Sequence, residues 1–182
     1  LIAVLLAAAV GSAWVALNAM AAIYTFLGAF FYGVVYTLWL KRRSWLNIVV
    51  GGLAGSFAVL AGAAAVDPQI GALPLILALV LFLWTPPHFW SLAIANEADY
   101  AAAGVPMLPV VVGPQRAAHI VLGNTVALVA ASLLPAFVGA GPIYLVGAVY
   151  LFLIRPTRQR VPDASDPTAV VGRRFDAWCI DL

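Results

Sequence analysis

The chain has 182 residues, of which 65% are hydrophobic and only 9% are charged, and its mean hydropathy is +1.06. A soluble domain carries roughly 25% charged residues, so this composition excludes a soluble enzyme, a nucleic-acid-binding protein and a disordered region. The formal net charge of +2 identifies no partner, and the single cysteine, Cys179, excludes an internal disulfide framework. We therefore expect an integral membrane protein that lies in the lipid bilayer and binds no nucleic acid.

Four stretches of the sequence contain no Asp, Glu, Lys or Arg, namely 1–40, 44–66, 68–96 and 117–154. A helical crossing needs about 20 apolar residues, so these stretches have room for six crossings. Barrel strands would alternate apolar and polar residues, whereas here the apolar residues run continuously, as only a helix can in lipid. The predicted fold class is all-α, a polytopic membrane helical bundle.

Breaks near Asn18 and in the run 139–142 divide two of these stretches, and Asp67-Pro68 is a strong turn signal. Pro114 suits the first turn of a helix, where its missing N–H costs nothing. The expected helices cover about residues 1–17, 20–40, 47–66, 72–94, 114–138 and 142–154.

The two ends of the chain suggest that it is a fragment. It begins at Leu1, inside an apolar run and without an initiator Met. We expect one partial membrane domain, 1–182, in which 156–182 form a cytoplasmic connection and the start of a truncated final helix.

All nine basic residues fall on one side of the six expected crossings. Asp67 is the only charge on the other side. The positive-inside rule makes the basic side cytoplasmic, so we expect a multi-pass cell (inner) membrane protein with a cytoplasmic site, or a mitochondrial inner-membrane protein in a eukaryote. The basic residues are Lys41, Arg42, Arg43, Arg116, Arg155, Arg158, Arg160, Arg173 and Arg174.

Two polar clusters on the basic side could bind a phosphate or a metal ion. Lys41-Arg42-Arg43, followed by Asn47, either anchors the topology or clamps an anion such as phosphate. The segment 96–109 carries Glu97 and Asp99, and carboxylate oxygens suit Mg²⁺ that is shared with a substrate phosphate. On a helix these two acids lie about 200° apart, so the alternative is a solvated loop.

A third cluster, residues 84–90, lies within an apolar helix and contains Pro86-Pro87 and His88. Two adjacent prolines free backbone carbonyls and kink a helix. His88 is either a packed, hydrogen-bonded side chain or a ligand of a metal cofactor. A further alternative is contact with a bulky planar substrate held between aromatic rings, namely Trp84, Phe89 and Trp90.

Together these motifs resemble the protoheme IX farnesyltransferase (heme O synthase) family, a branch of the UbiA superfamily of intramembrane prenyltransferases. The resemblance is close over about residues 20–115. The segments that carry it are 36–42 running into 47–52, Leu83 to Trp90, Asp99-Tyr100, and Ala103 to Pro109.

The resemblance implies a nine-helix bundle with a cavity open to the membrane and an active site at the cytoplasmic rim. It implies transfer of a farnesyl group from farnesyl diphosphate to a vinyl group of heme B, which gives heme O. Heme O would then be used in the biosynthesis of heme A, the cofactor of cytochrome oxidase, with heme A synthase as a downstream partner. Asp99 and Glu97 would bind Mg²⁺, Lys41 and Arg42 would hold the diphosphate, and His88 would contact the heme. The other substrate-binding residues implied are Trp84, Phe89, Trp90, Tyr100, Asn47 and Asn96.

One family feature is missing from this sequence. The family has a first acidic motif, an Asn and two Asp residues at four-residue spacing, before the helix that matches residues 1–17, yet 1–40 contain no carboxylate. We therefore expect the helices to match the family's third to eighth, and the chain by itself to be inactive. The alternatives are another UbiA-type prenyltransferase with a quinone-type or chlorophyll-type acceptor, and a non-enzymatic membrane transporter or scaffold.

Overall fold

The computed structural model describes residues 1–149, which are helical apart from short connections and contain no strand. The elements are α1 (Ile2–Ala16), α2 (Ala19–Phe30), the π-helix η1 (Phe31–Leu40), α3 (Asn47–Val66), α4 (Ala72–Ala95), α5 (Glu97–Ala102), α6 (Leu108–Val112), α7 (Pro114–Leu133), the 3-10 turn η2 (Leu134–Phe137) and α8 (Gly141–Val149).

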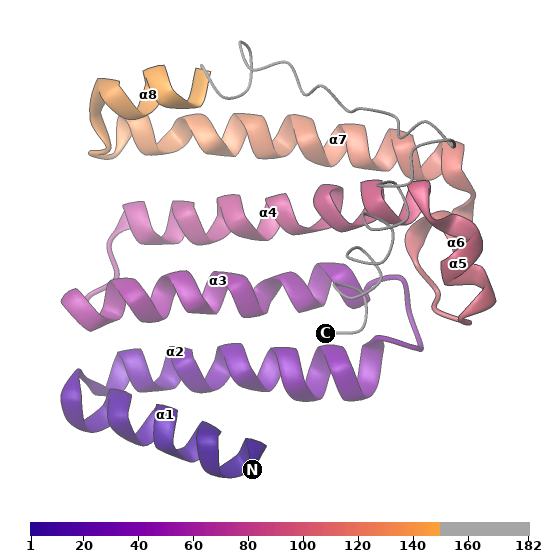
Figure 1. Cartoon of the computed structure of the whole chain (residues 1–182). Coiled ribbons are helices and arrows are strands. Elements are labelled where there is room, and N and C mark those ends of the chain that lie inside the picture. The colour runs from indigo at the N-terminus through magenta and orange to yellow at the C-terminus, as the bar shows by residue number, and fades with distance from the viewer. Residues whose placement is uncertain (150–182) are drawn as a thin grey trace, which may run out of the picture. The chain divides into compact units, whose positions relative to one another are not determined.

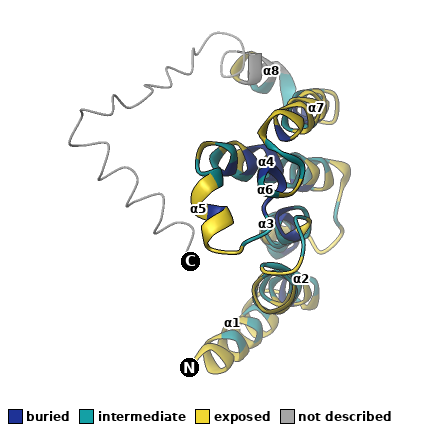
Figure 2. Ribbon diagram, turned by 90° about the vertical axis from the view of Figure 1, so that its right-hand side faces the viewer, coloured by how far each residue is buried: buried dark blue, intermediate teal, exposed yellow. Residues whose placement is uncertain are grey.

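The long helices form a row in which each packs on the helix before it and the helix after it. Figure 1 shows α1, α2, α3, α4 and α7 side by side in that order, with α5 and α6 together at one end. In the end-on view of Figure 2, buried residues lie on α3, α4 and α6, whereas α1 has none. Most apolar side chains therefore face outward, as expected of helices whose solvent is lipid.

The predicted all-α membrane fold is confirmed. Within residues 1–149, four helices are long and apolar enough to cross a bilayer, namely Ala19–Leu40, Asn47–Val66, Ala72–Ala95 and Pro114–Phe137, whereas Ile2–Ala16 is a shorter apolar helix. The helix expected over 142–154 is described only as far as Val149, so residues 150–154 lie outside the described residues. The connection 156–174 and the segment 175–182 lie outside them as well.

Small residues allow close contact along the middle of the row. A Cβ added to Gly52 of α3 would lie 3.2 Å from Thr85 Cβ on α4, and one added to Gly55 would lie 3.2 Å from the Leu81 side chain. Such glycines let two membrane helices approach closely enough for dispersion to hold them together. The α3–α4 pair thereby fixes the position of the segment around residue 85.

Side-chain hydrogen bonds also cross between helices within the apolar region. Asn18 accepts the Ala21 N–H at the start of α2 (2.9 Å) and donates to the carbonyl of Ala64 in the last turn of α3 (2.6 Å). Ser56 donates to the carbonyl of Ala78 on α4 (2.9 Å). The break predicted near Asn18 is thus an N-cap that also satisfies a carbonyl of the next helix.

The segment 96–113 forms two short helices, which the sequence analysis did not predict. α5 ends in a Schellman motif, in which Gly104 has φ +66° and donates to the carbonyl of Ala101 (3.1 Å), while Val105 donates to the carbonyl of Tyr100 (3.0 Å). Glycine adopts this left-handed conformation without strain. The Gly-Val-Pro sequence is therefore the stop signal of α5.

Candidate active site

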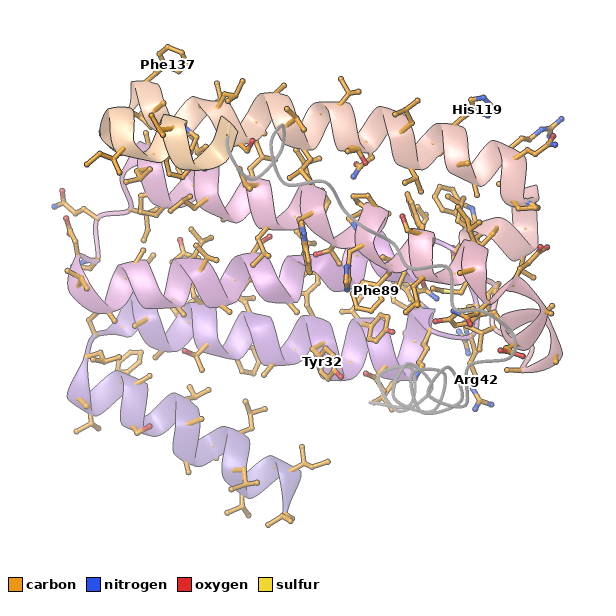
Figure 3. The ribbon with its side chains drawn as sticks, turned by 45° about the horizontal axis from the view of Figure 1, so that its top comes forward. Tyr32, Arg42, Phe89, His119 and Phe137 are labelled. Atoms are coloured by element: carbon orange, nitrogen blue, oxygen red, sulfur yellow. The ribbon has the colours of Figure 1, made fainter. Side chains whose placement is uncertain are left out.

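The helices of the row lie side by side, so their termini gather at two opposite ends. Six of the seven charged residues within 1–149 lie at one of these ends, and Asp67 lies in the α3–α4 connection at the other. Figure 3 shows Arg42 and His119 toward this end and Phe137 toward the opposite one. We call it the charged end. Its charged residues are Lys41, Arg42, Arg43, Glu97, Asp99 and Arg116.

Asn47 joins the two halves of the charged end. Its side chain is 1% exposed, and its Nδ2 donates to the carbonyl of Lys41 (3.1 Å) and lies 4.0 Å from the Sδ of Met107. Lys41 belongs to the basic turn, and Met107 begins the buried segment Met107–Pro109 that follows α5. The amide therefore holds the turn that carries the cations against the segment that follows the carboxylates.

The two carboxylates lie in the first turn of α5, where they stabilise the positive end of the helix dipole. Glu97 is half-buried and Asp99 is exposed. They are two positions apart in a helix and so do not share a face, and no group of three or more His, Cys, Asp or Glu side chains within residues 1–149 could hold a metal ion. The carboxylates suit Mg²⁺ chemically, but the described donor set does not form a complete site for it.

Tyr100 is the buried residue of α5, and Asn96 lies at the start of that helix. The Tyr100 side chain is 6% exposed, and burial, together with the nearby Tyr36 hydroxyl, raises its pKa to about 12. Asn96 donates from Nδ2 to the carbonyl of Leu92 (2.9 Å) and thus caps the end of α4. Both residues were predicted to bind substrate, and the structure places both beside Asp99 in the chain, at the charged end.

An exposed aromatic face lies farther along α4. The rings of Trp84 and His88 stack at 4.4 Å with an interplanar angle of 15°, and Phe89 meets His88 edge to face at 5.2 Å. Trp84 is 44% exposed and His88 is exposed. Three of the residues predicted to contact a planar substrate are therefore neighbours.

Trp90 does not join this face. Its side chain is 3% exposed and packs against Trp45, with ring centroids 6.1 Å apart. Trp90 follows His88 by two positions, about 200° around the helix, so the two rings point in different directions. The structure thus groups His88 with Trp84 and Phe89, and Trp90 with the basic turn.

Similarity to a known protein family extends over most of the chain. The sequence profile of the UbiA prenyltransferase family matches residues 1–175. The chain belongs to the UbiA prenyltransferase family. No solved structure matches the chain.

Curated relatives within the UbiA family are highly similar to this chain. Protoheme IX farnesyltransferase 2 of Paramagnetospirillum magneticum is 66% identical over 142 residues, which are 78% of this chain and 49% of that protein. Protoheme IX farnesyltransferase 1 of the same organism is 59% identical over 150 residues, 82% of this chain and 51% of that protein. Protoheme IX farnesyltransferase 1 of Cenarchaeum symbiosum is 49% identical over 142 residues, 78% of this chain and 48% of that protein. The chain spans about half the length of these relatives.

One polar residue of the apolar helix α7, Asn124, was not expected from the sequence to have a role. Asn124 of α7 donates from Nδ2 to the carbonyl of Leu83 on α4, at 2.6 Å. It is the only Asn in the predicted helix 114–138, and a polar residue in an apolar membrane segment is itself a signal of function or of an interhelical bond.

Proposed function

We propose that the protein transfers a farnesyl group from farnesyl diphosphate to a vinyl group of protoheme IX (heme B), giving heme O. The observation that supports this best is the exposed Trp84–His88 ring pair on α4. His88 lies seven residues before the end of α4, so about 10 Å of helix separates it from the charged end. That spacing suits a planar acceptor on the aromatic face and a diphosphate at the charged end.

The residues of the charged end would act on the leaving group. When the bond between the farnesyl C1 and the diphosphate oxygen breaks, its electron pair goes to the oxygen and leaves an allylic cation. Lys41 and Arg42 would stabilise the negative charge that develops on the diphosphate. The vinyl group then donates its π electrons to the farnesyl cation, and water adds to the new carbocation with loss of a proton. Apolar surroundings keep bulk water from quenching the first cation.

We further propose Mg²⁺ as the cofactor, with Asp99 as a ligand and Glu97 nearby. Bound there, the ion would neutralise charge on the diphosphate.

We place the reaction in a cell inner membrane, with the charged end on the cytoplasmic side. The positive-inside rule supports this orientation, because all four cations within 1–149 lie at that end. The product would pass to a heme A synthase and then to cytochrome oxidase. The names of the relatives, protoheme IX farnesyltransferases, support heme as the acceptor of the farnesyl group.

The test is a turnover assay on the complete gene product in liposomes with farnesyl diphosphate, Mg²⁺ and heme B, in which heme O is separated by chromatography. Asp99→Asn removes a proposed ligand of Mg²⁺ and should lower turnover at least about a hundredfold, because the ion would no longer stabilise the charge on the diphosphate. Asp67→Asn is the matched control and should leave turnover unchanged, because Asp67 lies at the other end of the row. Prenylation of an aromatic quinone precursor, with no heme product, would instead assign the chain to another UbiA branch.

A further inference from the structure

The carbonyl of Leu83 lacks its ordinary partner within α4. In an α-helix this carbonyl accepts the N–H of residue 87, and Pro87 has none. An unsatisfied carbonyl in a membrane costs several kcal/mol. Asn124 of α7 supplies the missing donor at 2.6 Å, and α4 runs from Ala72 to Ala95 with both prolines inside it.

Asn124 belongs to the stripe of α7 that packs on α4. Ala117, Leu128 and Ala131 are buried at positions seven before, four after and seven after it, and α7 packs extensively on α4. The neighbouring Thr125 bonds instead to the carbonyl of Val121 within its own helix (2.8 Å). The Asn124 amide is thus an interhelical contact placed at the level of the proline pair.

The bond acts directly on the aromatic face. The Leu83 carbonyl and the Trp84 N and Cα atoms belong to one rigid peptide plane. Holding this carbonyl therefore fixes the direction in which Trp84 leaves the helix, and Trp84 is stacked on His88 at 4.4 Å. Pro87, which leaves the Leu83 carbonyl without its helical donor, directly precedes His88 in the sequence.

We propose that Asn124 is a positioning residue for the acceptor, because its hydrogen bond to Leu83 holds the Trp84–His88 ring pair in the geometry that receives a planar macrocycle. This inference rests on the proposed function, in which heme B is the acceptor. It assigns Asn124 no contact with the heme itself.

The experiment is a titration of the complete gene product in detergent with heme B, followed by its Soret absorbance, together with the KM for farnesyl diphosphate. Asn124→Leu removes the donor and keeps a similar volume. It should raise the Kd for heme about three- to tenfold, the effect of one neutral hydrogen bond, and leave the KM for farnesyl diphosphate unchanged.

Asn18→Leu is the matched control. Asn18 also donates to a carbonyl of a neighbouring helix at 2.6 Å, but at the other end of the row. Its loss should lower the unfolding temperature without changing the Kd for heme. Equal heme affinities of the Asn124→Leu and Asn18→Leu variants would overturn the inference.

A second pair of variants tests the same bond if Asn124→Leu alone fails to fold. Pro87→Ala restores the N–H that bonds Leu83 within α4, so Asn124→Leu in that background should leave the Kd for heme as it is in Pro87→Ala alone. A further fall in affinity in the double variant would contradict the inference. The wild-type titration separates the two proposals: if it shows no heme binding, the proposed acceptor and the inference both fail, whereas heme binding that ignores Asn124 overturns the inference alone.

Discussion

At the residue scale, the structure of the charged end is held by a buried polar side chain, that of Asn47. Asn47 contributes its amide N–H groups to the carbonyl of Lys41 and to the sulfur of Met107, and it is 1% exposed. Removing a donor from a part-buried carbonyl destabilises the fold. Asn47 therefore helps to hold the basic turn in position.

We expect Asn47→Leu to lower the free energy of unfolding by about 1–3 kcal/mol, because the Lys41 carbonyl loses its donor. The midpoint of unfolding in detergent measures this. Ser44→Ala is the control in the same turn, since it removes only a bond to the backbone N–H of Leu46 (3.2 Å) on an exposed turn and should cost less than about 0.5 kcal/mol. An unchanged midpoint together with a raised KM for farnesyl diphosphate would favour direct substrate binding by Asn47, the role the sequence resemblance implies.

Tyr100 makes stability depend on alkaline pH. Burial raises its pKa in the folded chain to about 12, whereas in the unfolded chain it is about 10. The unfolded state therefore loses the proton first, so stability is full below pH 10 and falls as pH rises from 10 to 12. The unfolding midpoint of wild type should decline relative to Tyr100→Phe across that window and keep a constant offset from it between pH 7 and 9. A constant offset up to pH 12 would contradict the burial of the hydroxyl.

At the element scale, α3 packs on both α2 and α4. One of its glycines, Gly51, lies under the ring of Tyr36, where an added Cβ would come within 2.8 Å of Cδ2. Tyr36 belongs to the π-helix η1, a rare conformation that is often found at functional sites. The sequence predicted one helix over 20–40 but not its change to π geometry after Phe30.

Gly51→Ala should lower the free energy of unfolding by about 1–3 kcal/mol, because the Tyr36 ring must move. Gly62→Ala is the matched control in the same helix, since a Cβ there meets nothing within 4 Å. It should raise stability by about 0.5–1 kcal/mol through the better helix propensity of alanine. Equal effects of the two substitutions on the unfolding midpoint would refute the packing of Tyr36 on α3.

At the scale of the whole molecule, charge is separated between the two ends of the helix row. The turn 41–46 and the segment 96–113 lie at one end, while Asp67 and Gln69 lie in the connection between α3 and α4 at the other. The turn 41–46 and the α3–α4 connection both contain exposed residues. The two ends should therefore face opposite sides of a membrane.

We expect Arg43→Cys to react with a membrane-impermeant thiol reagent only from the cytoplasmic side, and Gln69→Cys only from the opposite side. Both variants are made in a Cys179→Ser background, so that no other thiol reacts. Labelling of right-side-out and inside-out vesicles gives the readout. Reaction of both positions from one side would contradict the alternating crossings of α3 and its neighbours.

Much of the candidate site could be predicted from local sequence. The basic triplet, the acids of 97–99 and the His88 motif each lie within a short run of the sequence. The residues within each cluster are therefore close together without any tertiary contact. The surroundings of Trp90 and the partner of Asn124 were beyond such reasoning. Whether an aromatic residue in an apolar run faces lipid or a neighbouring helix depends on which helix packs there, and the run itself is apolar on all sides.

The sequence by itself determined the long helices and the separation of charge, because backbone groups in lipid must bond within their own segment and charges must stay at its ends. The ranges expected for Asn47–Val66 and Ala72–Ala95 agree closely with the structure for that reason. Only the tertiary structure decided which polar groups meet between distant segments: Asn47 with the sulfur of Met107, and Asn124 with the carbonyl that Pro87 leaves without a partner. These pairs join residues on different elements, and uniform apolar surfaces do not encode which faces come together.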